Sequence, residues 1–512
     1  MTRTARRELG SPKGTVVHSG LVALPLLVAM GAAWAQDGRS YGLTPSASLD
    51  VTVTDNANLS SSNRETDAVT RANVGISGYS SHGRIRGAID YTLSGVLHSS
   101  ASSRNEIQHR LSANGSTELI ADHLFVDMTA SVGQQAISAF GVQSRDPALG
   151  GANRTQVSTF SVSPYLRGTL GAAVGYEARM SGSYSDAGSS AASNNGGTSA
   201  SFRLNSISSG SRISWSGSLS RQQVDYSLGR SSYQDRLALV LGYAVNQDLQ
   251  VSLTGGQERN NYVTTNSRSH TDVGLQLNWR PSERTSLSAS YGRQFFGSSH
   301  SVQFSYRTPR TAWVVVDSRG VSNTPGLAGT TISAYELYSL ALTSLQPDPA
   351  LRDQLVRQQL QRDNLNPNDP VTLGFVPASA AVQRTQSVSA VWFGLLDTVS
   401  LRLSRSQSNR LDTTTGSNSD LGQSDVVRQS GLSADVSHRL SPISSLALSA
   451  AYQRTRGQLA SQSSKLGTLT LAYTTRFGRH FDAAAGVRHS RFANSTSPYD
   501  ENAVWANVRV SF

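Results

Sequence analysis

The sequence predicts an all-β protein, a single antiparallel transmembrane β-barrel of about 22 strands (roughly 18 to 24) with one helical outer-loop insertion. Three observations support this prediction. Short apolar–polar alternations recur along the chain, the connections between them alternate between short and long, and the last segment is amphipathic. Because successive side chains of a strand point to opposite faces, such segments have one apolar and one polar face. Residues 36–512 are therefore expected to form the barrel.

The alternating segments are each about ten residues long, as expected for transmembrane strands. In residues 237–243 every second position is leucine or tyrosine, and residues 273–279 repeat the pattern with valine, leucine and tryptophan. The segments are expected to start near residues 45, 68, 83, 107, 122, 156, 172, 198, 211, 233, 248, 270, 284, 299, 311, 383, 397, 426, 444, 466, 480 and 501.

The connections differ by parity. Those after even-numbered segments are tight, as at Asn246-Gln247 and Ser441-Pro442, whereas those after odd-numbered segments are mostly long, as at residues 136–155 and 410–425. The link near Gly297 is the short exception. Outer-membrane barrels have short periplasmic turns and longer outer loops, so the parity indicates this class.

The two ends of the chain indicate export to the bacterial outer membrane. At the C-terminus, Val508, Val510 and Phe512 share one face of a strand that ends on an aromatic residue, a pattern that is expected to serve the outer-membrane assembly machinery as a signal. Residues 1–35 combine basic residues, an apolar run and a small-x-small site, so they are expected to be a signal peptide cleaved between Ala35 and Gln36.

Residues 319–381 interrupt the alternation and are expected to form a long extracellular loop or plug. Asp348 and Pro349 can begin a helix, and Leu351, Leu355 and Leu360 follow at helical spacing, which predicts a helix over residues 349–363. Residues 334–345 also have helical spacing. This insertion either caps the outer surface or folds over or into the mouth and restricts passage, and we expect the second arrangement.

No catalytic or cofactor site is expected. Cysteine is absent, the histidines lack metal-ligand spacing, and no nucleophile motif occurs in a strand–helix context, so we expect neither an enzyme nor a cofactor. The formal charge of +11 comes almost entirely from dispersed arginines, which does not indicate a nucleic-acid partner.

Arginine is expected to line the lumen, because a charge facing lipid at mid-bilayer costs about 2–4 kcal/mol. Acidic residues alternate with these arginines, so a wall of mutually neutralised charges is the simpler interpretation for each one. Taken together, an arginine surplus would favour anionic solutes. The pore-lining candidates are Arg84, Arg86, Arg110, Arg179, Arg212, Arg280, Arg402, Arg476, Arg488 and Arg509.

Several short motifs carry a family resemblance. They are Thr54-Asp55-Asn56, Asp90-Tyr91-Thr92-Leu93, Ser116-Thr117-Glu118-Leu119, Leu124-Phe125-Val126-Asp127 and Ser163-Pro164-Tyr165-Leu166. In this order they resemble the porin-like outer-membrane proteins associated with the PEP-CTERM/exosortase system. The resemblance implies a role near exopolysaccharide export, and the family supplies no catalytic or binding residues to carry over.

Two functions remain open from the sequence. The first is a porin-like outer-membrane channel that assists exopolysaccharide export or the passage of anionic saccharides. The second is a structural or adhesive surface barrel that binds glycan through its outer loops. Expected partners are outer-membrane lipid and lipopolysaccharide, the assembly machinery, and exopolysaccharide with its export components.

Overall fold

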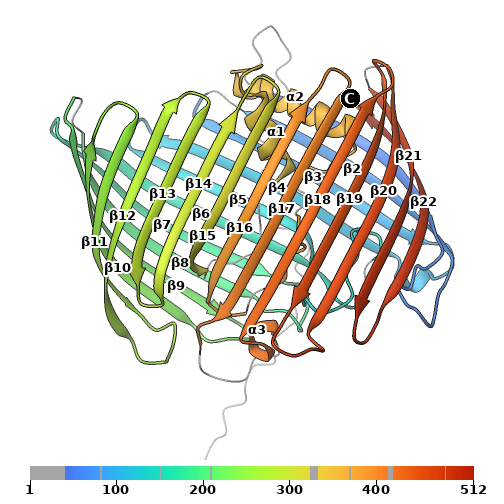
Figure 1. Cartoon of the computed structure of the whole chain (residues 1–512), viewed down its shortest axis with the longest axis horizontal. Helices are drawn as coiled ribbons and strands as arrows, with labels where there is room; N and C mark the ends of the chain where they lie inside the picture. Colours follow the sequence, from blue (N-terminus) through green and yellow to red (C-terminus); the bar gives the residue numbers. More distant parts are fainter. Residues whose placement is uncertain are drawn as a thin grey trace, which may run out of the picture. The chain divides into compact units, whose positions relative to one another are not determined.

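A computed structural model describes residues 41–80, 83–149, 151–207, 210–322, 333–367, 371–376, 378–412, 419–478 and 480–512. The expected signal peptide, with its cleavage site at Ala35 and Gln36, lies outside the described residues. The described chain forms one closed barrel of 22 antiparallel strands (Figure 1). The predicted fold class and strand number are therefore confirmed.

Each strand pairs with its neighbours in sequence, and β1 pairs with β22 to close the sheet. The first eleven strands are β1 (Tyr41–Thr54), β2 (Asp67–Ser80), β3 (Ile85–His98), β4 (Glu106–Ile120), β5 (Leu124–Ala136), β6 (Arg154–Leu170), β7 (Val174–Asp186), β8 (Asn195–Ser206), β9 (Ile213–Tyr226), β10 (Ser232–Ala244) and β11 (Leu249–Asn260). The others are β12 (Arg268–Ser282), β13 (Thr285–Gln294), β14 (Gly297–Arg307), β15 (Thr311–Ser322), β16 (Ala381–Phe393), β17 (Asp397–Arg410), β18 (Val426–Arg439), β19 (Ser444–Arg456), β20 (Ser463–Phe477), β21 (Phe481–Asn494) and β22 (Tyr499–Ser511).

The described parts of the connections contain four short helical elements: the 3₁₀ helix η1 (Ser102–Arg104) and the α-helices α1 (Ala334–Leu342), α2 (Pro349–Arg362) and α3 (Asp420–Gln423). Helices α1 and α2 both belong to the connection between β15 and β16. Among the described residues, no helix combines the length and the apolar character needed to cross a membrane.

The two ends of the barrel differ in their connections. Those after even-numbered strands have between two and six residues, and Gly171 and Gly210 adopt positive φ angles of 62° and 94° there. Glycine enters this left-handed region without the steric penalty of a Cβ atom. Most connections after odd-numbered strands are longer, and the two-residue link between β13 and β14 is the exception that the sequence predicts. We call the two ends the short-turn end and the long-loop end.

The two faces of the wall also differ. On β10, Leu237, Leu239 and Leu241 are 43–60% exposed, although leucine is usually buried in soluble proteins. Similar exposed apolar residues alternate with inward polar ones around the barrel. A lipid bilayer requires an apolar outer face and backbone groups that are all hydrogen-bonded, and the closed sheet meets both requirements.

Candidate functional site

A helical hairpin occupies the lumen at the short-turn end. Ser322 and Ala381, where the β15–β16 connection leaves and rejoins the wall, are directly paired at the long-loop end. Helix α1 nevertheless packs against the opposite ends of these strands, where Ala312, Val314 and Val391 are buried. These three residues alternate with the exposed Trp313 and Trp392, so they face inward. The described part of the connection that contains α1 and α2, residues 333–367, therefore lies inside the barrel at the short-turn end (Figure 1).

Local sequence explains why the two helices form. Ser333 and Glu336 make a reciprocal capping box at the start of α1, which satisfies backbone donors that a helix otherwise leaves free. At the start of α2, the carboxylate of Asp348 accepts a hydrogen bond from the Leu351 amide at 3.0 Å. Tyr335 Oη then joins the helices by donating to Asp353 Oδ1 at 2.6 Å.

Helix α1 is held mainly by apolar packing. Ala334, Leu337, Tyr338 and Ala341 are at most 4% exposed and contact the inner wall of β15 and β16. The Tyr338 ring also meets the Phe393 ring edge to face, at a centroid separation of 5.4 Å. Burying such side chains contributes about 1.5–3 kcal/mol each, so α1 is the apolar anchor of the hairpin.

Helix α2 reaches other strands through polar contacts. Arg357 Nη1 lies 2.9 Å from Asp90 Oδ2 on β3, and Gln361 Nε2 donates to Asp482 Oδ2 on β21 at 2.7 Å. The carbonyl of Arg362 accepts hydrogen bonds from Ser445 on β19 and Thr474 on β20. Helix α2 therefore extends between separated parts of the wall.

Asp363, directly after α2, is a buried carboxyl group at the junction of both helices and the wall. It accepts a hydrogen bond from Tyr338 Oη at 3.0 Å and is 3% exposed. Burial raises the pKa of Asp363 to about 6, although hydrogen bonds from Ser437, Gln359 and Tyr338 oppose the shift.

The hairpin lies inside the barrel, as in the second arrangement expected from the sequence, but at the short-turn end instead of the outer mouth. Among the leucines expected on the apolar face of the second helix, Leu360 is buried but Leu351 is 49% exposed. Val356 is buried instead of Leu351. The expected helix over residues 349–363 compares with Pro349–Arg362 in the structure. Parity places the ends of a connection correctly, but it says nothing about how far a connection of this length extends inside the barrel.

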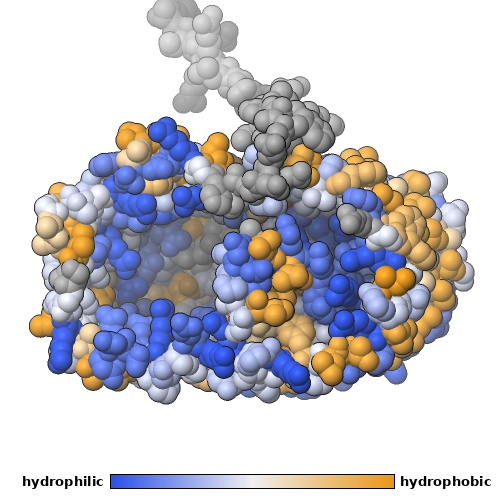
Figure 2. Space-filling view, turned by 90° about the horizontal axis from the view of Figure 1, so that it is seen from above, coloured by the Kyte–Doolittle hydropathy of each residue, from blue (hydrophilic) through white to orange (hydrophobic). Residues whose placement is uncertain are grey.

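A cavity of about 1340 Å³ lies between α2 and the short-turn ends of β1–β4 and β18–β22. Its lining contains six arginines and six aspartates: Arg110, Arg357, Arg362, Arg439, Arg476, Arg509, Asp50, Asp90, Asp353, Asp363, Asp397 and Asp482. Viewed onto this end, the barrel has deep hydrophilic hollows (Figure 2). The hairpin therefore narrows the lumen, and polar surface remains beside it.

Six of the ten pore-lining candidates lie at the short-turn end. Arg86, Arg280, Arg476 and Arg509 are within three residues of strand ends there, and each adjoins an exposed outward apolar residue, so each faces inward. Arg84 and Arg212 directly precede β3 and β9. Arg476 pairs with Asp482 at 3.1 Å. The structure thus brings six arginines from separate strands or turns to one mouth.

The other four candidates lie deeper. Arg110 lines the cavity beside α2, and Arg179 binds Asp127 at 2.8 Å. Arg402 is 3% exposed with Asp435 at 3.9 Å, and Arg488 binds both Asp146 and Glu501 at 2.7 Å. For the last three, local charge neutralisation by these acids is the clearest role.

An inward-folded segment, which the sequence analysis missed, narrows the long-loop end. Residues 137–153 connect β5 to β6 and reach β19–β22, where Tyr499 Oη donates to the Gln143 carbonyl at 2.6 Å and Gln453 donates to Gln143 Oε1 at 3.1 Å. Leu149, 1% exposed, lies in an apolar cluster with inward residues of β2, β3, β20, β21 and β22. The available sequence signal was the apolar residues of this otherwise polar loop, Ile137, Phe140, Val142 and Leu149.

The expected assembly signal lies on β22, where this strand pairs with β1 and closes the barrel. Val508 and Val510 on β22 lie opposite Leu49 and Ala47 on β1, and the Phe512 amide donates to the Pro45 carbonyl at 3.0 Å. The Phe512 side chain is 72% exposed. Recognition of these residues by the assembly machinery stays a prediction.

Comparison with known proteins gives a fold likeness. No protein-family model matches the sequence, and no curated protein matches it. Solved structures similar to the chain include the siderophore receptor PirA from Pseudomonas aeruginosa, with 11% identity over 92% of this chain and 80% of that chain and a TM-score of 0.44. The FrpB iron transporter from Neisseria meningitidis, in its apoprotein form, is 9% identical over 92% and 81%, with a TM-score of 0.47.

The closed 22-stranded sheet, the apolar outer wall and the hydrophilic interior define an outer-membrane-type β-barrel. The protein is located in the bacterial outer membrane. The short-turn end faces the periplasm in such barrels, and the long-loop end faces outward.

Proposed function

We propose that the protein is a restricted outer-membrane channel for anionic saccharides, whose α1–α2 hairpin limits passage. The observation that carries this proposal is the placement of the hairpin inside the lumen beside a large polar cavity. A barrel of this strand number encloses a lumen wide enough for solutes, so an internal element becomes the natural determinant of permeability.

The arginines at the short-turn mouth support an anionic solute. Arg84, Arg86, Arg212, Arg280 and Arg509 come from four different parts of the sequence and gather at the periplasmic end. Charges that line a pore select for the opposite sign and concentrate it at the entrance. A polyanion arriving from the periplasm would meet them first, which favours export over uptake. The resemblance to PEP-CTERM/exosortase-associated proteins is in line with an exopolysaccharide as that polyanion.

Single-channel recording with the rim variant R86Q/R280Q/R509Q tests the selectivity. Passive anion passage predicts that the wild-type barrel conducts anions in preference to cations and that the rim variant has a lower anion-to-cation permeability ratio. The matched control is R293Q, because Arg293 is outward on β13 beside the exposed Tyr291 and should not affect the lumen. An unchanged ratio in the rim variant would contradict the anionic solute.

A second candidate is the glycan-binding surface barrel. It is favoured by the contacts that tie the outer loops together, including the ion pair between Arg230 after β9 and Asp412 after β17, at 3.0 Å. Together with residues 137–153, these contacts narrow the outer mouth. A barrel that stays non-conducting after removal of the hairpin would favour this second function.

A further inference from the structure

The outer face of β15–β20 carries basic side chains near the long-loop end. Arg405, for example, is exposed between Ser404 and Ser406, which are 7% and 3% exposed, so it points away from the lumen. By the same alternation we define the outer basic patch as Arg319, Arg384, Arg405, Arg428, Arg454, Arg456 and Lys465.

Strand register places these residues in two adjoining rows. One row runs across four strand pairs as Arg319, Arg384, Gln407, Arg428 and Arg456. The other contains Gln386, Arg405, Ser430, Arg454 and Lys465. Directly opposed residues have Cβ atoms about 4.5–5.5 Å apart, so the two rows form one continuous surface.

Like charges face one another within the patch. Arg428 lies opposite Arg456, and Arg454 lies opposite Lys465. Such pairs destabilise a sheet unless an anion lies between them. Among the described outward residues near this end of β15–β20, Asp317 is the only acid, and it is bound by Arg384 at 2.8 Å and by His300 at 3.1 Å. The β17–β20 part of the patch therefore lacks an acidic partner on its own surface.

An apolar row begins immediately below the patch. The next outward residues toward the short-turn end are Val388, Leu403, Leu432 and Tyr452, which are 37–43% exposed and lie opposite one another across β16–β19. Two residues of a strand span about 7 Å, so basic and lipid-facing side chains are neighbours. The cost of a charge falls from about 2–4 kcal/mol at mid-bilayer to about 0–1 kcal/mol at the interface, and this boundary is where lipid headgroups lie.

We infer that the outer basic patch binds the phosphorylated headgroup of a saccharide lipid in the outer leaflet. The acyl chains lie against the Leu403–Tyr452 row, and the phosphates lie between the opposed cations. Guanidinium groups suit this ligand because their donors match phosphate oxygens in a bidentate manner. Two adjoining rows provide positions for more than one phosphate group.

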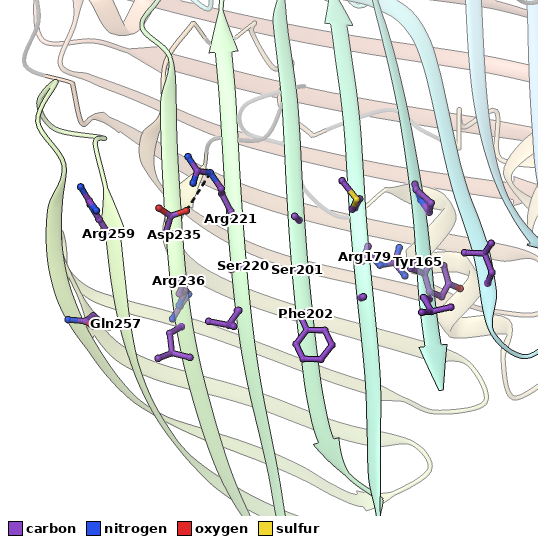
Figure 3. Close-up of a pocket in the computed structure, with 18 of the residues that line it drawn as sticks. Tyr165, Arg179, Ser201, Phe202, Ser220, Arg221, Asp235, Arg236, Gln257 and Arg259 are labelled. Atoms are coloured by element: carbon purple, nitrogen blue, oxygen red, sulfur yellow. Dashed lines mark ion pairs between the residues drawn. The ribbon is translucent and has the colours of Figure 1, made fainter. Parts of the chain in front are cut away.

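Other sectors of the outer wall differ. Near the same end, the outward residues of β5, β6, β7 and β8 include Gln134, Gln156, Tyr184 and Thr198. On β9–β11, Arg221 and Arg259 both lie opposite Asp235, and Arg221 is 3.7 Å from that carboxylate (Figure 3). These two arginines share an acidic partner, whereas the cations of the β17–β20 part of the patch have none on their own surface.

The test uses the full-length barrel in nanodiscs and bisphosphorylated lipid A as the probe. Native mass spectrometry should show that wild type retains this lipid in preference to dephosphorylated lipid A. The variant R405Q/R428Q/R454Q/K465Q should lose at least tenfold in retention. The charge-preserving R405K/R428K/R454K variant should retain most of the binding, and R221Q/R259Q should behave as wild type.

Thermal unfolding gives an independent readout that a folding defect would not reproduce. Without lipid A, the glutamine variant should melt no lower than wild type, because it removes two like-charge pairs. With lipid A, only the proteins with an intact patch should gain stability. Equal retention by wild type and the glutamine variant would overturn the inference. If inorganic phosphate at equal phosphate concentration displaced lipid A, the patch would be a site for free anions and not for a lipid. If a soluble anionic glycan displaced lipid A, the patch would be a glycan site.

Discussion

The two helices of the luminal hairpin contact the barrel through different chemistry. Helix α1 buries Leu337, Tyr338 and Ala341 against β15 and β16, whereas α2 uses an ion pair and hydrogen bonds to β3 and β19–β21. Apolar contacts lose their stabilisation when they separate in water, but water can replace most of a hydrogen bond. The difference indicates that α1 fixes the hairpin and that α2 can release β3 and β19–β21 at small cost.

Truncating the apolar anchor should have the largest effect. Leu337 is 0% exposed, and L337A should cost about 2–5 kcal/mol of docking free energy. The natural chain has no cysteine, so the thiol of A341C, at a position 4% exposed, reports undocking through its rate of labelling by a membrane-impermeant maleimide. L337A should raise this rate at least tenfold. L351A is the control, because Leu351 is 49% exposed and its loss should leave the rate unchanged. Equal rates in L337A and its parent would show that α1 is not the anchor.

Raising the pH should loosen the hairpin by an intermediate amount. The pKa of Asp363 is about 6 when the hairpin is docked, compared with 3.8 for the ordinary carboxyl group. A raised folded-state pKa contributes stability that is complete below the unfolded pKa and is lost as the pH rises through the folded value. Between pH 5 and pH 7.5 the docking equilibrium should therefore weaken about tenfold, at about 1.4 kcal/mol per pKa unit.

The comparison with D363N isolates this effect. The ratio of A341C labelling rates in the parent and in D363N cancels the pH dependence of the thiol itself. This ratio should rise with pH, because only the parent has the buried carboxyl group to ionise. A ratio that is constant or falls between pH 5 and pH 7.5 would contradict the assigned environment of Asp363.

Breaking the ion pair between Arg357 of α2 and Asp90 of β3 should have the smallest effect. Arg357 and Asp90 have side chains 41% and 38% exposed, so their pairing is worth less than about 1 kcal/mol after solvent screening. R357A should raise A341C labelling only a few-fold, and the increase should shrink at high salt. The exchanged pair D90R/R357D should restore part of the loss. An effect of R357A as large as that of L337A would remove the distinction between the two helices.

The sequence predicts the barrel well because its signals are local. Alternation within a strand and the length of each connection depend on neighbouring residues, and they yield the strand number and the two ends. The position of residues 333–367 depends on a distant inner wall that sequence spacing does not reveal. Residues 137–153 are missed for the same reason, since Leu149 finds its partners on β2, β3 and β20–β22.

Arginine shows a second limit of sequence reasoning. Alternation along the strands places Arg86, Arg280 and Arg509 on the inner face, next to exposed apolar neighbours. The same alternation places Arg405 and Arg428 on the outer face. Charge is tolerated there because the free-energy cost of a lipid-facing charge is high at mid-bilayer and low at the membrane interface. Position along a strand therefore matters as much as the face, and strand ends are the least certain part of a sequence-based assignment.

Conductance after removal of the hairpin tests the restricted channel most directly. Residues 330–375 are replaced by a short Gly-Ser linker, which is feasible because Ser322 and Ala381 are already paired. We expect a larger single-channel conductance and greater sensitivity of cells to bulky antibiotics, with the barrel still inserted as a heat-modifiable band. Replacing residues 61–63 of an exposed loop is the control and should change neither property. Unchanged conductance in a correctly inserted hairpin deletion would contradict the proposal that the hairpin restricts the channel.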